Sequence, residues 1–143
     1  MLNKYVKNQK GLTLIELLAV IVILGIIAAI AVPAIGNVIE KSRNDAVHAD
    51  ATQVLNAAKL YVASEAPTST VTFDNDTSTT AIDNGLEDYL ENIESYSITI
   101  TVENGEYRYT DIHVEKDERE VTYPTEQNLL NRDVDVTPVT PAT

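Results

Sequence analysis

Apolar side chains dominate the first quarter of the chain and form one long run. Residues 17–35 carry no charged side chain, and the run is interrupted only by Gly25 and Pro33. A helix needs about 20 such residues to cross the hydrocarbon core of a bilayer. The pattern therefore predicts a helix that is covered on all sides, either by lipid or by other helices.

A carboxylate lies at the start of this apolar run. Glu16 follows Leu14 and Ile15 and directly precedes the uncharged residues 17–35. An ionised side chain in a membrane-spanning segment costs about 3 kcal/mol or more unless it is paired, so it marks a functional site by default. Because the run contains no cation, we interpret Glu16 as a residue that needs a positively charged partner from elsewhere.

The segment before the run indicates where that charge comes from. Residues 1–11 contain three lysines and no acid, which is typical of a targeting segment. Cleavage between Gly11 and Leu12 would create an α-amino group about one helical turn from Glu16. That amine, in the same or a neighbouring subunit, is the predicted partner. The alternative is a secretory leader cleaved after the small residues at 28–31.

The helical pattern continues beyond the run but becomes one-sided. Residues 38–65 contain neither Pro nor Gly, and apolar positions recur at steps of three and four residues. The predicted inner face is Val47, Ala51, Val54, Ala58, Tyr61 and Glu65, with Asp45, Asp50, Gln53 and Lys59 on other faces. The pair Ala66-Pro67 ends a helix of about 50 residues. Pro33 predicts a kink or local opening within it.

The remaining chain has the pattern of a small antiparallel domain. Residues 66–80 are polar and predict a surface loop, and residues 83–93 predict a short helix capped near Asp83 or Asn84. Apolar and polar residues then alternate through residues 96–103, which predicts a half-buried strand.

Asn104-Gly105 follows this strand and predicts a type I′ hairpin turn. The turn would place Val102 opposite Tyr107 and Ile100 opposite Tyr109. The apolar parity then changes, which predicts a bulge near Thr110 or Asp111. A turn at residues 116–118 leads to a third strand at 119–123. The polar residues 124–143 predict a tail, of which residues 134–143 alternate Thr, Val and Pro and are expected to be extended or mobile.

Composition narrows the possible functions. The chain has 143 residues and a formal net charge of −12. It contains no cysteine, so neither disulfide nor thiol chemistry is available. Lysines before the apolar run and acids after it predict that the C-terminal part lies outside the membrane. Such an acidic surface disfavours nucleic-acid binding, which depends on Lys and Arg.

Catalytic and metal-binding patterns are weak in this sequence. His48 and His113 are the two histidines, and we interpret both as ordinary surface residues, with no enzymatic activity, cofactor or metal expected. Residues 74–78 are similar to part of a calcium loop but lack the Gly and Glu that the EF-hand pattern requires. Residues 75–77 form a possible glycosylation triplet.

The N-terminal features together resemble those of the type IV pilin and pseudopilin family. The residues that carry the resemblance are the basic leader, Gly11, Leu12, Thr13, Glu16, Gly25 and Pro33. The resemblance implies that a prepilin peptidase cleaves after Gly11 and N-methylates Leu12, which is Phe in most of the family. It further implies that Glu16 meets the N-terminal amine of an adjacent subunit and sets the register of a helical filament.

The resemblance also implies an α+β pilin fold, with a long N-terminal helix packed on a small β-meander. The expected divisions are a cleaved leader at 1–11, a membrane or filament-core helix at 12–39, an amphipathic helix at 40–65, a loop, short helix and three-stranded sheet at 66–123, and a tail at 124–143. Gly25 and Pro33 would allow residues 25–33 to unwind partly during assembly.

Three functions are compatible with these patterns. The first is a major pilin, a precursor in the cytoplasmic membrane that becomes a homopolymer at the cell surface through an assembly platform protein and ATPase. The second is a minor pilin or pseudopilin of a type II secretion or DNA-uptake system. The third is an ectoenzyme or receptor held by an uncleaved anchor, against which Glu16 and the leader argue.

Overall fold

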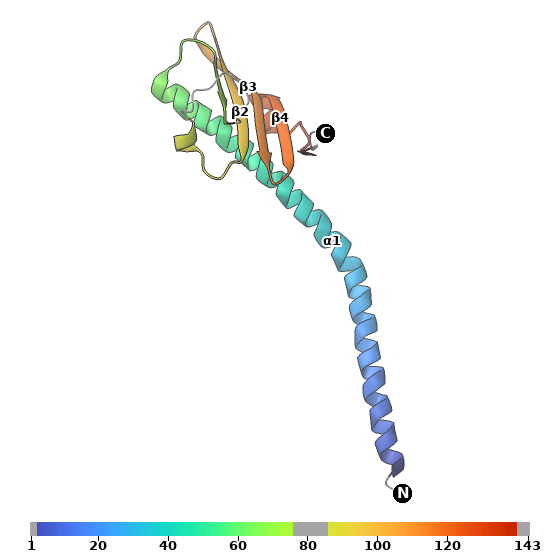
Figure 1. Ribbon diagram of the computed structural model, residues 1–143. Helices are drawn as coiled ribbons and strands as arrows, with labels where there is room; N and C mark the ends of the chain where they lie inside the picture. Colours follow the sequence, from blue (N-terminus) through green and yellow to red (C-terminus); the bar gives the residue numbers. More distant parts are fainter. Residues whose placement is uncertain (1–2, 76–85, 140–143) are drawn as a thin grey trace. The chain divides into compact units, whose positions relative to one another are not determined.

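The computed structural model describes residues 3–75 and 86–139, with side chains from residue 13 onward except at residue 87. The elements in chain order are α1 (Asn3–Glu65), β1 (Val71–Asp74), η1 (Glu87–Tyr89), β2 (Ser95–Glu103), β3 (Glu106–Lys116), β4 (Arg119–Thr125), α2 (Glu126–Asn131) and β5 (Thr137–Pro138) (Figure 1). The chain divides into two units, Met1–Lys41 and Ser42–Thr143. A long helix followed by an antiparallel sheet confirms the predicted α+β fold class.

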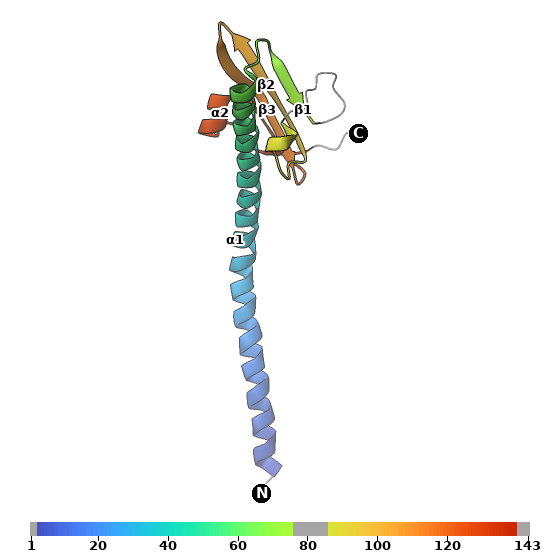
Figure 2. The same cartoon turned by 90° about the vertical axis from the view of Figure 1, so that its left-hand side faces the viewer.

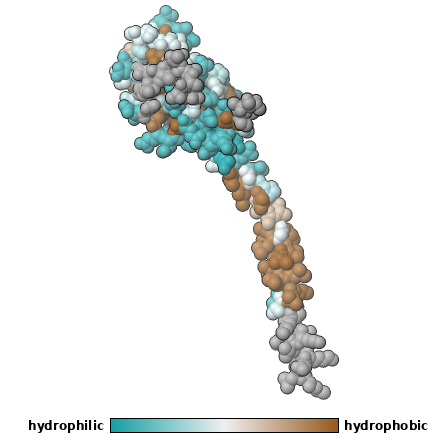
Figure 3. All heavy atoms as spheres, viewed as in Figure 1, coloured by the Kyte–Doolittle hydropathy of each residue, from teal (hydrophilic) through white to brown (hydrophobic). Residues whose placement is uncertain are grey.

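The first unit is the N-terminal part of α1. The helix begins at Asn3 and continues without a break through Gly11, so the predicted leader is helical and continuous with the apolar segment. Pro33 lies inside the helix and does not end it. The large apolar side chains between Leu14 and Ile39 are all at least 50% exposed, and they form a continuous apolar surface in Figure 3.

The second unit packs the C-terminal part of α1 against the sheet (Figure 2). The predicted helix face is confirmed from Val47 to Ala58, because Val47, Ala51, Val54 and Ala58 are at most 1% exposed. Of the last two predicted positions, Tyr61 is half-buried against the core, and the prediction was wrong at Glu65, which is exposed. The opposite layer of the core is Phe73, Leu86, Tyr96, Ile98, Ile100, Ile112, Val114, Val121, Tyr123 and Leu129. Burial of these side chains stabilises a domain that has no disulfide.

The sheet has five strands in the order β1-β2-β3-β4-β5, not the three that the sequence predicts. Residues 71–74 form β1 and not a loop, because Phe73 is fully buried and pairs with Ile98 of β2. The predicted polar tail contains α2, which the sequence did not predict, and the two-residue strand β5. Thr125 caps α2, since its side chain accepts a hydrogen bond from the backbone N–H of Asn128.

Both hairpins of the meander have two-residue turns. Asn104 and Gly105 have φ values of 53° and 81°, and Val102 faces Tyr107 as predicted. The predicted bulge is confirmed at Asp111, where φ is 52° and β3 has one residue more than β2 between paired positions. The observed register of β2 with β3 is the one that the two-residue turn predicts, so the turn sets this pairing.

The short helix predicted at 83–93 is present only as η1 in the described residues. Its predicted caps, Asp83 and Asn84, lie outside the described residues. After η1, Asn92 has a φ of 61°, which is left-handed and incompatible with continuing a right-handed helix. Leu86 is nevertheless fully buried in the domain core, so this connection contributes to packing.

An ion pair joins α1 to the sheet at a position where the sequence predicts an exposed acid. Asp50 was expected on the polar face of α1, but it is 5% exposed. Its Oδ2 lies 2.6 Å from Nζ of Lys116, at the end of β3. Asp50 is three residues after Val47 and four residues before Val54, and residues at these spacings are neighbours on a helix surface. Asp50 therefore lies at the margin of the apolar face.

We predict that the two halves of this pair are unequal in their effect on stability. Replacing Lys116 by Met should lower the free energy of unfolding by about 3 kcal/mol, because Asp50 would remain buried without its cation. Asp50→Asn should cost about 1 kcal/mol, because its amide oxygen still accepts a hydrogen bond from Lys116. Chemical denaturation of the full chain in detergent, followed by circular dichroism, measures both changes.

The matched control is Arg108→Met, which removes a cation from an exposed ion pair with Glu103. It should change the free energy of unfolding by less than about 0.5 kcal/mol. Equal losses for Lys116→Met and Arg108→Met would show that burial of Asp50 has no particular role.

Candidate functional site

The first candidate site is the start of the apolar segment in α1. Glu16 lies four residues after Leu12 in one continuous helix, so the two positions share a helix face about 6 Å apart along the axis. The carboxylate of Glu16 has no hydrogen-bond or ion-pair partner among the residues that the structure describes. The side chain of Leu12 lies outside the described part of the structure.

The surroundings of Glu16 determine what that carboxylate can do. Its apolar neighbours Leu14, Ile15 and Leu17 are 69%, 61% and 62% exposed, so no part of the same domain covers them. An exposed apolar surface of this size marks a contact with lipid or protein. Once covered, the site has a low dielectric constant, in which a nearby amine would strongly stabilise the carboxylate.

Gly25 and Pro33 lie further along the same apolar surface. A Cβ atom added at Gly25 would meet nothing within 4 Å, so no contact inside the described chain requires a glycine there. Pro33 has no backbone N–H and therefore leaves the carbonyl of residue 29 without its helical donor. Both positions weaken the helix locally, although α1 is continuous through them.

His48 contacts the sheet and is not the ordinary surface residue that the sequence predicts. His48 of α1 is hydrogen-bonded through Nδ1 to the hydroxyl of Tyr123 of β4, and the two rings lie 5.8 Å apart. It is therefore part of the packing between α1 and the sheet, and the prediction of an ordinary surface residue was wrong. His113 of β3 is hydrogen-bonded to Thr122 of β4, with Nδ1 2.8 Å from Oγ1.

Burial shifts the pKa values of this pair in opposite directions. Burial, followed by the nearby positive charge of Arg132, lowers the pKa of His48 below 6.5, while Asp45 and Asp135 oppose that change. Burial raises the pKa of Tyr123 to about 12. Both groups are thus neutral at pH 7, which suits a hydrogen bond at the edge of the core.

The weak calcium pattern falls partly outside the described residues, since residues 76–78 are not described. The side chain of Asn75 is hydrogen-bonded to the backbone. Its Oδ1 accepts a hydrogen bond from the N–H of Tyr96 at 2.6 Å, and its Nδ2 donates one to the carbonyl of Glu94 at 3.1 Å. In the described part of the chain, no group of three or more His, Cys, Asp or Glu side chains is placed to hold a metal ion.

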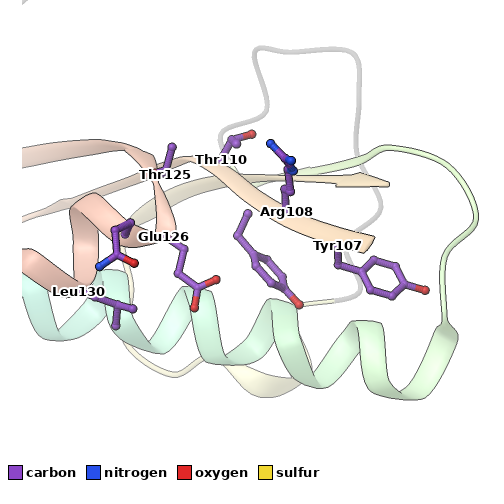
Figure 4. Close-up of a pocket in the computed structure, with 8 residues that line it drawn as sticks. Tyr107, Arg108, Thr110, Thr125, Glu126 and Leu130 are labelled. Carbon is purple, nitrogen blue, oxygen red and sulfur yellow. The ribbon is translucent and has the colours of Figure 1, made fainter. Parts of the chain in front are cut away.

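A groove of about 560 Å³ lies between the start of β3 and α2 (Figure 4). It is lined by Tyr107, Arg108, Tyr109, Thr110, Thr125, Glu126, Gln127 and Leu130. Lys59 of α1 contacts Glu126 at 2.5 Å and lies 5.7 Å from the ring centre of Tyr109. The groove was not predicted because α2 was not predicted. The local signal for α2 is the capping residue Thr125 followed by the acidic Glu126 in the first turn.

Comparison with known families finds a match to the N-terminal segment. A family profile described as the prokaryotic N-terminal methylation motif matches residues 6–32. This match, together with the long helix and the antiparallel sheet, supports a type IV pilin-like prepilin. The motif and the apolar helix from residue 13 also fit a membrane-anchored precursor. Neither the curated proteins nor the solved structures contained a match.

We predict a pH dependence of stability from the His48–Tyr123 pair. The unfolded chain takes up a proton at His48 near pH 6.5, whereas the folded chain resists it, so stability should fall as the pH drops from 7 toward 5. The unfolded Tyr123 loses its proton near pH 10 and the folded one near 12, so stability should also fall across that interval.

Thermal melts of three variants test this linkage. His48→Gln should flatten the acid limb, and Tyr123→Phe should flatten the alkaline limb at a cost of about 1 kcal/mol at pH 7. The control is His113→Gln, which removes the other histidine and should retain the acid limb. An acid limb that is unchanged in His48→Gln would contradict the assignment.

Proposed function

We propose that this chain is a major pilin, a structural and non-enzymatic subunit that polymerises into an extracellular type IV filament. The observation that carries the proposal is the methylation-motif match at 6–32 on a helix whose apolar side chains are exposed on every side. Such a surface needs cover, first from the membrane and then from the same helix of other subunits.

Maturation is proposed to begin with removal of residues 1–11. A prepilin peptidase cleaves between Gly11 and Leu12 and methylates the new amino group of Leu12. Loss of the three leader lysines takes the formal net charge from −12 to −15. Because the amine lies in the same apolar environment as Glu16, each subunit offers one cation and one carboxylate, and pairing between neighbouring subunits would fix their axial spacing.

The remaining parts of the chain have proposed roles in the same assembly. The helix at 12–39 forms the filament core, and local weakness at Gly25 and Pro33 allows residues 25–33 to unwind partly. The acidic domain forms the outer surface, where its charge disfavours nucleic acid and maintains solubility. Partners are the membrane, the prepilin peptidase, an assembly platform protein with its ATPase, and other copies of the chain.

A minor pilin or pseudopilin of a type II secretion or DNA-uptake system is the alternative. The matched motif supports a pseudopilin-type precursor equally well, because it covers the N-terminal segment and none of the sheet. Filament length and subunit abundance on cells distinguish the two: long filaments made chiefly of this chain indicate a major pilin, and short or trace assemblies indicate the alternative.

We predict that Gly11→Leu stalls the precursor in the membrane, because a bulky side chain at the cut site should exclude it from the peptidase. Intact-mass and N-terminal peptide mass spectrometry of sheared surface material and of membranes measures the result. Wild type and the control Gly11→Ala should yield chains that begin with methylated Leu12. Abundant mature protein from Gly11→Leu would contradict the assigned cut.

We predict that Glu16→Ala permits cleavage but lowers filament yield at least about tenfold, since the amine of Leu12 would lose its buried counter-charge, worth several kcal/mol. The yield is measured as sheared filament protein relative to mature protein in membranes. The control is Glu65→Ala, the same change at an exposed position of the same helix. Normal yield from Glu16→Ala would exclude the pairing.

A further inference from the structure

The first four residues of β3 have one unpaired edge. β3 pairs with β2 from Glu106 onward, but its pairing with β4 begins only at Thr110. β4 ends at Thr125, where the chain turns into α2. Among the described residues, therefore, no strand lies beside the segment 106–109 on the side of β4. An open strand edge of this kind is a template for pairing with another chain.

The register of the hairpin shows which backbone groups face this edge. Glu103 and Glu106 flank a two-residue turn and so form the hydrogen-bonded pair that closes it. The N–H and C=O of Glu106 therefore point toward β2. Because these groups alternate along a strand, those of Tyr107 and Tyr109 point toward the side of β4. Thr110 bonds to β2 and forms a non-hydrogen-bonded pair with Thr125, which engages the C=O of Tyr109. The N–H and C=O of Tyr107 and the N–H of Tyr109 therefore remain for a new partner.

The charges on the outer face of this segment are unbalanced within one molecule. Glu103 and Glu106 lie directly opposite each other, an arrangement of like charges that is unfavourable across two strands. Arg108 contacts Glu103, with Nε 3.7 Å from Oε2. Among the described residues, Glu106 has no ion pair. The exposed residues Glu106 and Arg108 thus place one acid without an ion pair and one cation on either side of the half-buried Tyr107.

We propose that two copies of this chain pair through this edge, with their β3 strands antiparallel and centred on Tyr107. In that register Tyr107 faces Tyr107 of the second copy in a hydrogen-bonded pair. Glu106 then lies opposite Arg108 of the second copy, and the reverse pair forms by symmetry. Both ion pairs lie on the same face, with Cα atoms about 4.5 Å apart.

The charge pattern selects this register over its neighbours. Centring the contact on Arg108 would place two arginines directly opposite each other, and centring it on Glu106 would do the same with two glutamates. The contact centred on Tyr107 is the self-complementary one. Arg108 and Tyr107 project to opposite sides of β3 (Figure 4), so the ion pairs and the aromatic pair lie on different faces.

The groove beside α2 supplies room for the partner. In the proposed register, Gly105 of the second copy lies opposite Tyr109, so the tip of its hairpin points toward Thr125 and α2. The groove of about 560 Å³ occupies that place, between Tyr109 and Leu130. The space is therefore adjacent to the strand edge and in line with β4, as an added hairpin requires.

The size of the contact indicates where it acts. A few paired residues bury less area than the roughly 1,200 Å² of a stable complex, so isolated chains should pair weakly. A two-fold contact cannot repeat between subunits that all point the same way along a filament. It can join two neighbouring filaments, where many weak contacts act together. This last step rests on the proposed function.

Disulfide trapping tests the pairing in the full chain. The chain has no cysteine, so Tyr107→Cys introduces a single thiol. A hydrogen-bonded pair has Cα atoms about 5.5 Å apart, within the range that a disulfide bridges. Mild oxidation in detergent should give a covalent dimer from Tyr107→Cys, with at least about tenfold less from Thr122→Cys, an exposed position on β4. Equal yields, or no dimer from Tyr107→Cys, would overturn the proposal.

Charge reversal tests the register in the same Tyr107→Cys background. Glu106→Arg or Arg108→Glu alone should lower the dimer yield about tenfold, because each places like charges opposite one another. The double variant Glu106→Arg/Arg108→Glu should restore it, since the pattern is again self-complementary. Thermal melts establish that each variant is folded. Failure of the double variant to recover, with folding intact, would exclude this register.

Electron microscopy of sheared material then separates this inference from the proposed function. Wild type and the double charge-reversal variant should form bundled filaments, and Glu106→Arg should form single filaments of normal length. Equal bundling in all three would overturn the contact between filaments while leaving the pilin assignment intact. Absence of filaments in wild type would count against the proposed function, and the trapping experiment would still decide whether two chains pair.

Discussion

The exposed apolar surface of α1 is the constraint on which the rest of this structure depends. The large apolar side chains between Leu14 and Ile39 are each at least half exposed. The hydrophobic effect therefore requires an external partner, and a continuous cylinder of apolar side chains fits lipid or other helices of the same kind. An apolar surface alone does not fix the position of a partner along the helix. Glu16 does restrict it, because a carboxylate in an apolar environment is stable only where a cation lies beside it.

The globular unit has a different physical basis. Its core is one cluster of apolar side chains, contributed by the C-terminal part of α1 and by the sheet that faces it, without a disulfide. Polar contacts at the margin join α1 to distant parts of the chain: Asp50 to Lys116, His48 to Tyr123, and Asp45 to Arg132 at 3.0 Å. The last of these connects α1 to the residue that ends α2. These contacts position the C-terminal segment, and that segment forms one wall of the groove beside β3.

The two units explain how one chain can support both strong and weak association. Burial of the helix surface is extensive and non-directional, so it suits a permanent filament core. The open edge of β3 offers a few backbone hydrogen bonds and two symmetric ion pairs, so it suits a contact that depends on repetition. The open edge follows from the position of β4, whose end at Thr125 leaves residues 106–109 of β3 without a neighbouring strand on that side among the described residues.

Local patterns determined much of this protein. The sequence alone predicts the apolar run, the buried face of α1 from Val47 to Ala58, the Asn104-Gly105 turn, its register and the bulge, because each depends on residues close together in the chain. Tertiary structure decided the rest. Val71 and Phe73 form a strand only because β2 offers them an edge, and Asp50 is buried only because Lys116 reaches it from the far end of β3. Such long-range pairings leave no periodic signal, since their partners lie more than 20 residues apart.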